Sequence, residues 1–114
     1  MIEEKSFEFA VRIVKLYKWL CKGHNEYVLS KQLLRSGTSI GANITEAQAA
    51  QSKKDFIAKM AIASKEARES KYWLRLLIRS DYLNKNDVSV KSFMKEINDI
   101  INIVTKIVKT SQGK

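Results

Sequence analysis

Proline is absent from the 114 residues of this chain, and glycine occurs only four times. β-Sandwiches and barrels need many tight turns, and these two residue types supply most of them. Their scarcity excludes turn-rich β architectures and favours long, uninterrupted helices. Long hydrophobic runs are missing as well, since no apolar stretch approaches the roughly 18 residues of a membrane span.

The amino terminus also lacks the features of a secretory signal. In its first residues, MIEEKSFEFA, the pair Glu3 and Glu4 lies where a signal peptide has positive charge, and no long apolar stretch follows. We therefore expect a cytoplasmic protein with no membrane partner. The chain length suits one domain, residues 1–114, because two domains of half this size would each be too small to enclose a core.

Residues that carry chemistry are few. Cys21 is the single cysteine and His24 the single histidine, so an intramolecular disulfide and a cysteine-based zinc cluster are excluded. A di-iron bundle needs a Glu-x-x-His pair on two helices, which one histidine cannot supply. No nucleotide-binding G-K-[ST] or zinc-protease H-E-x-x-H motif occurs. We expect no catalytic residue, no metal and no cofactor, and hence a protein that is not an enzyme.

What the chain does have is positive charge. Twenty-one Lys and Arg residues stand against twelve Asp and Glu residues, which gives a formal net charge of +9 and a pI near 9.7. Such an excess attracts polyanions, namely nucleic acid, acidic proteins or anionic lipid surfaces. The alternative is that the charge serves solubility alone.

Hydrophobic periodicity predicts four helices, at about residues 4–22, 27–51, 52–80 and 87–109. Short loops join them, so neighbours in the chain should pack as antiparallel neighbours in space. The predicted fold class is therefore all-α, an antiparallel up-down-up-down four-helix bundle. Gly23 follows the first helix at the position where a left-handed C-cap is expected.

The sequences of two of these helices predict close contact with another helix or with a second subunit. The first carries two apolar stripes, one with Phe7 and Val14 and the other with Phe9 and Ile13. One stripe suffices for the core of a monomeric bundle, so a neighbouring subunit should cover the other. In the second helix, Gly37 and Gly41 leave a flat strip that another helix could approach closely. The expected assembly is a homo-oligomer.

Two basic rows are candidate nucleic-acid contacts. The first consists of Arg68, Lys71, Arg75 and Arg79, beside Tyr72. The second consists of Arg12, Lys15 and Lys22, near Trp19. Cations at helical spacing with an aromatic ring nearby can follow a phosphate backbone and stack a base. The competing interpretation is an ordinary solvated helix face.

A polar set accompanies the flat strip. It comprises Arg35, Asn43 and Glu46 on the second helix and Glu66 and Glu69 on the third. Polar side chains in a strip rich in glycine and alanine need solvent or a partner, because burial without one costs a few kcal/mol. We predict a structural polar network between helices or subunits. A ligand site and plain solvation are the alternatives.

Three segments resemble a known family: KQLLRSGTSIGANITEA at residues 31–47, KDFI at 54–57 and KEARESKYWL at 65–74. They are similar to the four-helix-bundle proteins encoded in intervening sequences of bacterial 23S rRNA genes, and the similarity covers roughly residues 7–108. The resemblance implies a ring, most commonly a pentamer. It also implies kinship with the accessory proteins of diversity-generating retroelements, which engage nucleic acid and a reverse transcriptase. It implies no enzymatic activity.

The predicted function is accordingly that of a non-enzymatic, basic, homo-oligomeric accessory protein that binds RNA or other nucleic acid. RNA is preferred because of the resemblance and not because of any residue. A reverse transcriptase-like or other protein is a further expected partner. The alternative function is a protein–protein interaction scaffold with no nucleic-acid role.

Overall fold

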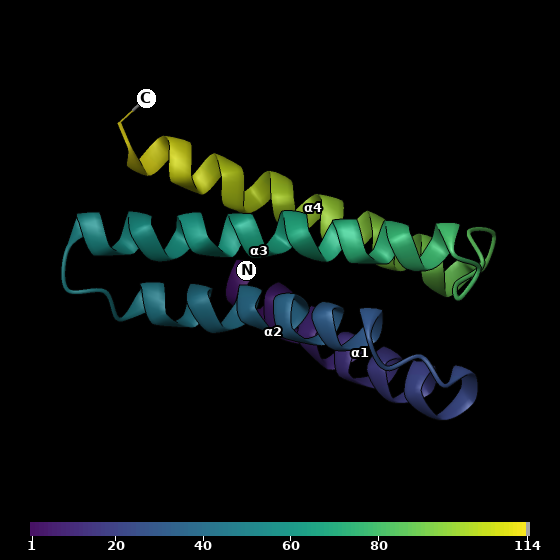
Figure 1. The fold of residues 1–114 in the computed structure, drawn as a ribbon. Helices are drawn as coiled ribbons and strands as arrows, with labels where there is room; N and C mark the ends of the chain where they lie inside the picture. The colour runs from purple at the N-terminus through teal and green to yellow at the C-terminus, as the bar shows by residue number, and fades with distance from the viewer. Residues whose placement is uncertain (114) are drawn as a thin grey trace.

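The computed structural model describes residues 1–113 and contains four helices and no strand within that range (Figure 1). The helices are α1 (Ile2–His24), α2 (Leu29–Gln48), α3 (Lys53–Arg79) and α4 (Val88–Ser111). Each helix packs antiparallel to its neighbour in the chain, and α1 also touches α4, though less extensively. The prediction of an all-α four-helix bundle is confirmed. Within the described residues, no helix has the length and apolarity needed to cross a bilayer.

One stripe of each helix forms the core. On α1 this stripe is Phe9, Ile13, Leu16 and Leu20, and on α4 its centre is Phe93, Ile97, Ile100 and Val104. The rings of Phe9 and Phe93 meet edge to face with their centroids 6.2 Å apart, which joins α1 to α4. The other stripe of α1 stays outside, with 64% of Phe7 and 37% of Val14 exposed. The sequence had predicted both stripes.

The end of α1 corrects one prediction. Gly23 was expected to be the left-handed C-cap, but the helix continues through His24, and Asn25 takes that conformation with φ 52°. Asparagine tolerates a positive φ better than other residues with a side chain. Nothing lies within 4 Å of where a Cβ on Gly23 would stand, so packing does not require a glycine there either.

The start of α2 is organised by a residue that the sequence pattern did not reveal. The Glu26 carboxylate is buried and accepts hydrogen bonds from the backbone N–H groups of Val28, Leu29 and Ser30, at 3.1, 2.9 and 2.7 Å. These are donors that the first turn of a helix leaves without partners. The predicted start at residue 27 is therefore two residues early, because the chain is turning around Glu26 there.

The remaining helix ends follow capping chemistry. Ser52 accepts a hydrogen bond from the Asp55 N–H at 3.0 Å and begins α3 as predicted. Asp87 accepts from the N–H groups of Ser89 and Val90 and begins α4. The second helix ends at Gln48, three residues before the predicted boundary, and α4 extends to Ser111, two residues beyond it.

The flat strip of α2 lies against α1 of the same chain. A Cβ on Gly37 would stand 3.0 Å from both Cγ atoms of Ile13, and one on Gly41 would stand 3.4 Å from the Ser6 carbonyl oxygen. The strip therefore does admit a second helix closely, as predicted. Its partner is intramolecular, however, so the strip no longer argues for an oligomer.

Candidate nucleic-acid interface

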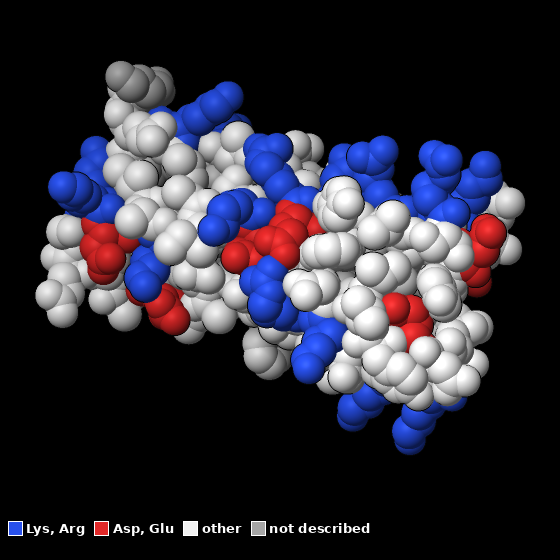
Figure 2. Space-filling model, in the orientation of Figure 1, with Lys and Arg blue, Asp and Glu red and all other residues white. Residues whose placement is uncertain are grey.

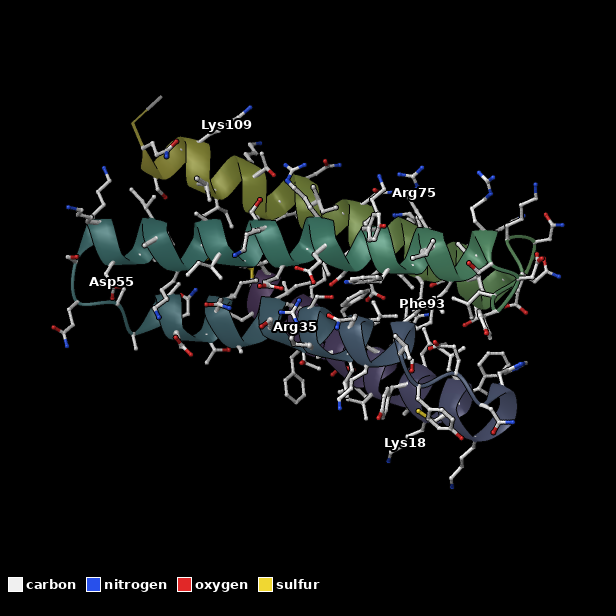
Figure 3. The ribbon with its side chains drawn as sticks, viewed as in Figure 1. Lys18, Arg35, Asp55, Arg75, Phe93 and Lys109 are labelled. Carbon is white, nitrogen blue, oxygen red and sulfur yellow. The ribbon has the colours of Figure 1, made fainter. Side chains whose placement is uncertain are left out.

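The first basic row follows one side of α3. Arg68, Arg75 and Arg79 are exposed and Lys71 is half-buried, each one helical turn from the next. Lys and Arg side chains gather along the upper edge of the molecule in Figure 2, over α3 and α4. Arg75 and Lys109 mark that edge in Figure 3. The first basic row therefore lies on the surface of a single chain.

Between α3 and α4 this surface is hollowed in two places. One hollow of about 400 Å³ is lined by Arg68, Lys71, Tyr72, Arg75, Asn98, Ile101 and Asn102. The other, of about 370 Å³, is lined by Arg68, Ile101, Asn102, Thr105, Lys106, Lys109 and Thr110. Because the hollows share three lining residues, they form one continuous depression, which we call the α3/α4 groove.

The α3/α4 groove carries five cations and no carboxylate among the described residues that line it. Arg68 lies at its middle, and its guanidinium donates a hydrogen bond to the Thr105 hydroxyl at 2.9 Å, which holds α3 to α4. Cations with no acidic neighbour produce a positive potential that concentrates anions. Successive turns of a helix place such groups about 5–6 Å apart, near the phosphate spacing of a single strand.

The second basic row is divided by the fold. Arg12 donates to the Glu96 carboxylate at 2.7 Å and to the Ser92 hydroxyl at 3.1 Å, and its guanidinium lies 4.0 Å above the centre of the Phe93 ring. It therefore joins α1 to α4, and we no longer assign it to the interface. Lys15 and Lys22 remain exposed on α1.

A larger hollow, of about 730 Å³, lies between α1, the loop before α4 and the start of α4. Its walls include Leu16, Trp19 and Phe93, and its charged residues are Arg12, Lys15, Asp81 and Asp87. Since the two signs balance there, this hollow lacks the excess of positive charge that distinguishes the α3/α4 groove. It is a less suitable surface for a polyanion.

The predicted polar network exists in part. Arg35 forms ion pairs with Glu66 at 3.4 Å and with Glu69, and Glu69 accepts a hydrogen bond from the Trp73 indole at 3.1 Å. The indole hydrogen bond is the main cause of a lowered Glu69 pKa, and Arg35 adds to it against the opposing effect of burial. These contacts join α2 to α3 at the surface of the bundle, where the Arg35 side chain is 52% exposed.

Two members of the predicted set lie outside this network. Asn43 donates to the Ser39 carbonyl within its own helix at 2.9 Å, and Glu46 pairs with Lys59 at 2.8 Å. Helical spacing shows which residues share a face of α2, but it does not show which partner each side chain takes. Trp73, which the sequence pattern did not single out, belongs to the network through its hydrogen bond to Glu69.

The residues of α4 that line the groove were not among those predicted from the sequence. Asn98, Asn102, Lys106 and Lys109 recur every three or four residues, a helical spacing that could have revealed a polar face of α4. What the spacing could not reveal is that this face lies beside Arg68 of α3. His24 and Cys21 contribute nothing to the groove, since His24 packs against Trp19 and Cys21 lies 4.0 Å from Ser30.

Residues 1–106 match the family described as 23S rRNA-intervening sequence protein. The chain belongs to this family. The match extends over α1, α2, α3 and most of α4, so it includes the residues that line the α3/α4 groove except Lys109 and Thr110. It confirms the family to which the three segments of the sequence had pointed.

A solved structure shares the fold of this chain. It is a protein of unknown function from the S23 ribosomal protein family of Bacteroides thetaiotaomicron VPI-5482, 51% identical, with a TM-score of 0.91 over 96% of this chain and 99% of that chain. A search of curated proteins found no match. Kinship with the accessory proteins of retroelements, and with it a reverse transcriptase-like partner, stays a prediction.

Proposed function

We propose that this 23S rRNA-intervening sequence protein is a non-enzymatic accessory protein that binds nucleic acid, with RNA preferred, through the α3/α4 groove. The observation that carries the proposal is the set of five cations that line the groove, three from α3 and two from α4, with no carboxylate among its described lining residues. Lysine and arginine bind phosphates without reading sequence. The preference for RNA comes from the family, whose name refers to an rRNA gene.

Neutralising one cation on each wall should weaken binding and reduce its salt dependence. In the double variant Arg75→Gln with Lys106→Gln, the log–log slope of affinity against salt should become shallower by about 0.7 for each lost contact with a single strand. We expect affinity at moderate salt to fall by about tenfold or more. Titration of a fluorescent RNA at several salt concentrations measures both quantities.

The matched control is Lys53→Gln with Lys54→Gln, which removes the same charge from exposed residues at the start of α3, away from the groove. An equal loss of affinity in this control would mean that net charge alone drives binding and that the groove is not the site. Wild-type protein that shows no salt-dependent binding would leave the scaffold function as the better account.

We also propose that the protein self-associates through the outer stripe of α1. Phe7 and Val14 are exposed there, with Ala10, Tyr17 and Cys21 half-buried between and beyond them. Steps of three and four residues between these positions are the spacing of a helix-pairing seam. A neighbouring copy of the chain is a suitable cover for the stripe, and it leaves the α3/α4 groove, on other helices, open. Association would repeat the groove and strengthen weak contacts through effective concentration.

Acidic substitutions on this stripe should therefore separate the subunits without unfolding them. For Phe7→Glu with Val14→Glu, light scattering should give the 13.1 kDa mass of one chain, whereas the wild type should give a multiple of it. Val88→Glu is the control, because Val88 is 83% exposed but lies at the start of α4. A wild-type protein of 13.1 kDa at micromolar concentration would contradict self-association.

A further inference from the structure

We propose that the nucleic acid held in the α3/α4 groove is single-stranded RNA, with one unpaired base stacked on the ring of Tyr72. The inference rests on the proposed function and goes further, since cations alone would hold a duplex equally well. It depends on the shape and chemistry of the hollow between α3 and α4. The experiment below separates its failure from the failure of nucleic-acid binding.

Tyr72 is an exposed aromatic ring among cations. It is 56% exposed, it helps to line the hollow of about 400 Å³, and Arg68 and Arg75 lie one helical turn away on either side. Single strands are bound where a positive groove follows the backbone and aromatic rings take the bases. With a cation before and after the ring, successive phosphates can be neutralised while the base between them stacks.

Contacts with neighbouring side chains hold the Tyr72 ring in place. Tyr72 meets Trp73 edge to face, with centroids 5.0 Å apart and an interplanar angle of 77°. The Trp73 indole donates to Glu69, and Glu69 is in turn paired with Arg35 of α2. This series of contacts connects the Tyr72 ring, through Trp73 and Glu69, to Arg35 of the neighbouring helix α2. A side chain that is already ordered loses less entropy when its ligand binds.

Across the hollow, α4 presents groups that suit the edge of a base. Asn98 and Asn102 line the same hollow as Tyr72, and an amide side chain offers both a donor and an acceptor. Unpaired RNA bases are recognised by stacking together with hydrogen bonds to their edges. In duplex RNA the faces of the bases are hidden by their neighbours and the major groove is too narrow for side chains. Only an unpaired base can use both walls of the hollow.

The test compares ten-nucleotide oligouridylate with a ten-base-pair RNA duplex, on wild-type protein and on Tyr72→Leu and Tyr72→Phe. For Tyr72→Leu we expect affinity for the single strand to fall tenfold to a hundredfold, about the contribution of one stacked base, with no change in the salt slope. Tyr72→Phe keeps the ring and should bind within about twofold of wild type, because stacking needs the ring face and not the hydroxyl. Affinity for the duplex should be the same in all three proteins.

The outcomes distinguish base stacking on Tyr72 from nucleic-acid binding by the basic groove. If Tyr72→Leu binds the single strand as tightly as wild type while Arg75→Gln with Lys106→Gln still weakens it, stacking is overturned and the basic groove remains. If neither RNA binds in a salt-dependent manner, the proposed function fails and this inference with it. Far-UV circular dichroism of each variant verifies that the bundle is intact.

Discussion

Leucine in place of Gly37 should lower the free energy of unfolding by about 1–3 kcal/mol or more. Gly37 is buried on α2, and a Cβ there would already stand 3.0 Å from both Cγ atoms of Ile13, which is fully buried on α1. Leucine adds three further carbons at a place where not even one fits without movement. Either α1 must move away from α2 or Ile13 must leave its rotamer.

Chemical denaturation measures this effect, and Gly23→Leu is its control. No atom lies within 4 Å of a Cβ on Gly23, so the same substitution there meets no steric obstacle. Leucine is a better helix former than glycine by up to about 1 kcal/mol, so Gly23→Leu should leave stability unchanged or raise it. Equal behaviour of the two variants would contradict the close packing of α2 on α1.

Alanine in place of Glu26 should cost about 2 kcal/mol, at the upper end for the loss of a helix cap. Its carboxylate satisfies three backbone N–H groups at the start of α2, and alanine would leave all three without that acceptor. For a domain of this size the melting temperature should fall by roughly 4–8 °C for each kcal/mol. Thermal denaturation followed by circular dichroism measures it.

The same residue predicts a dependence on pH. Burial by itself raises the pKa of Glu26, but hydrogen bonds from the backbone of Leu29, Ser30 and Val28 outweigh it, and the pKa is lowered. A carboxylate with a lowered pKa in the folded state stabilises the protein above its unfolded pKa, about 4.5. That contribution is lost as the pH falls through the lower, folded pKa.

Glu26→Gln removes the titration and keeps the shape. The stability difference between wild type and Glu26→Gln should therefore be constant near neutral pH and shrink as the pH falls below about 4.5. Urea denaturation at a series of pH values between 3 and 7 gives this difference. A difference that does not change across that range would show that the carboxylate charge has no part in capping α2.

Much of the bundle follows from local sequence. The recurrence of Phe9, Ile13, Leu16 and Leu20 at steps of three and four is sufficient to place a helix and its buried face. Ser52 begins α3 by capping its first turn, which depends only on residues within that turn. Arg68, Lys71, Arg75 and Arg79 follow one side of α3 for the same reason, because helical spacing alone decides which side chains are neighbours.

The partners of those faces depend on the tertiary structure. Nothing in the spacing of Arg12 distinguishes a free cation from one paired with Glu96, eighty-four residues away. Likewise, the α4 residues that complete the groove are adjacent to Arg68 only because α3 and α4 pack at one particular rotation. Periodicity specifies a face within one helix, whereas contacts between helices depend on how side chains interlock across the interface. The basic row of α3 was therefore visible in the sequence, and the groove appeared only in the fold.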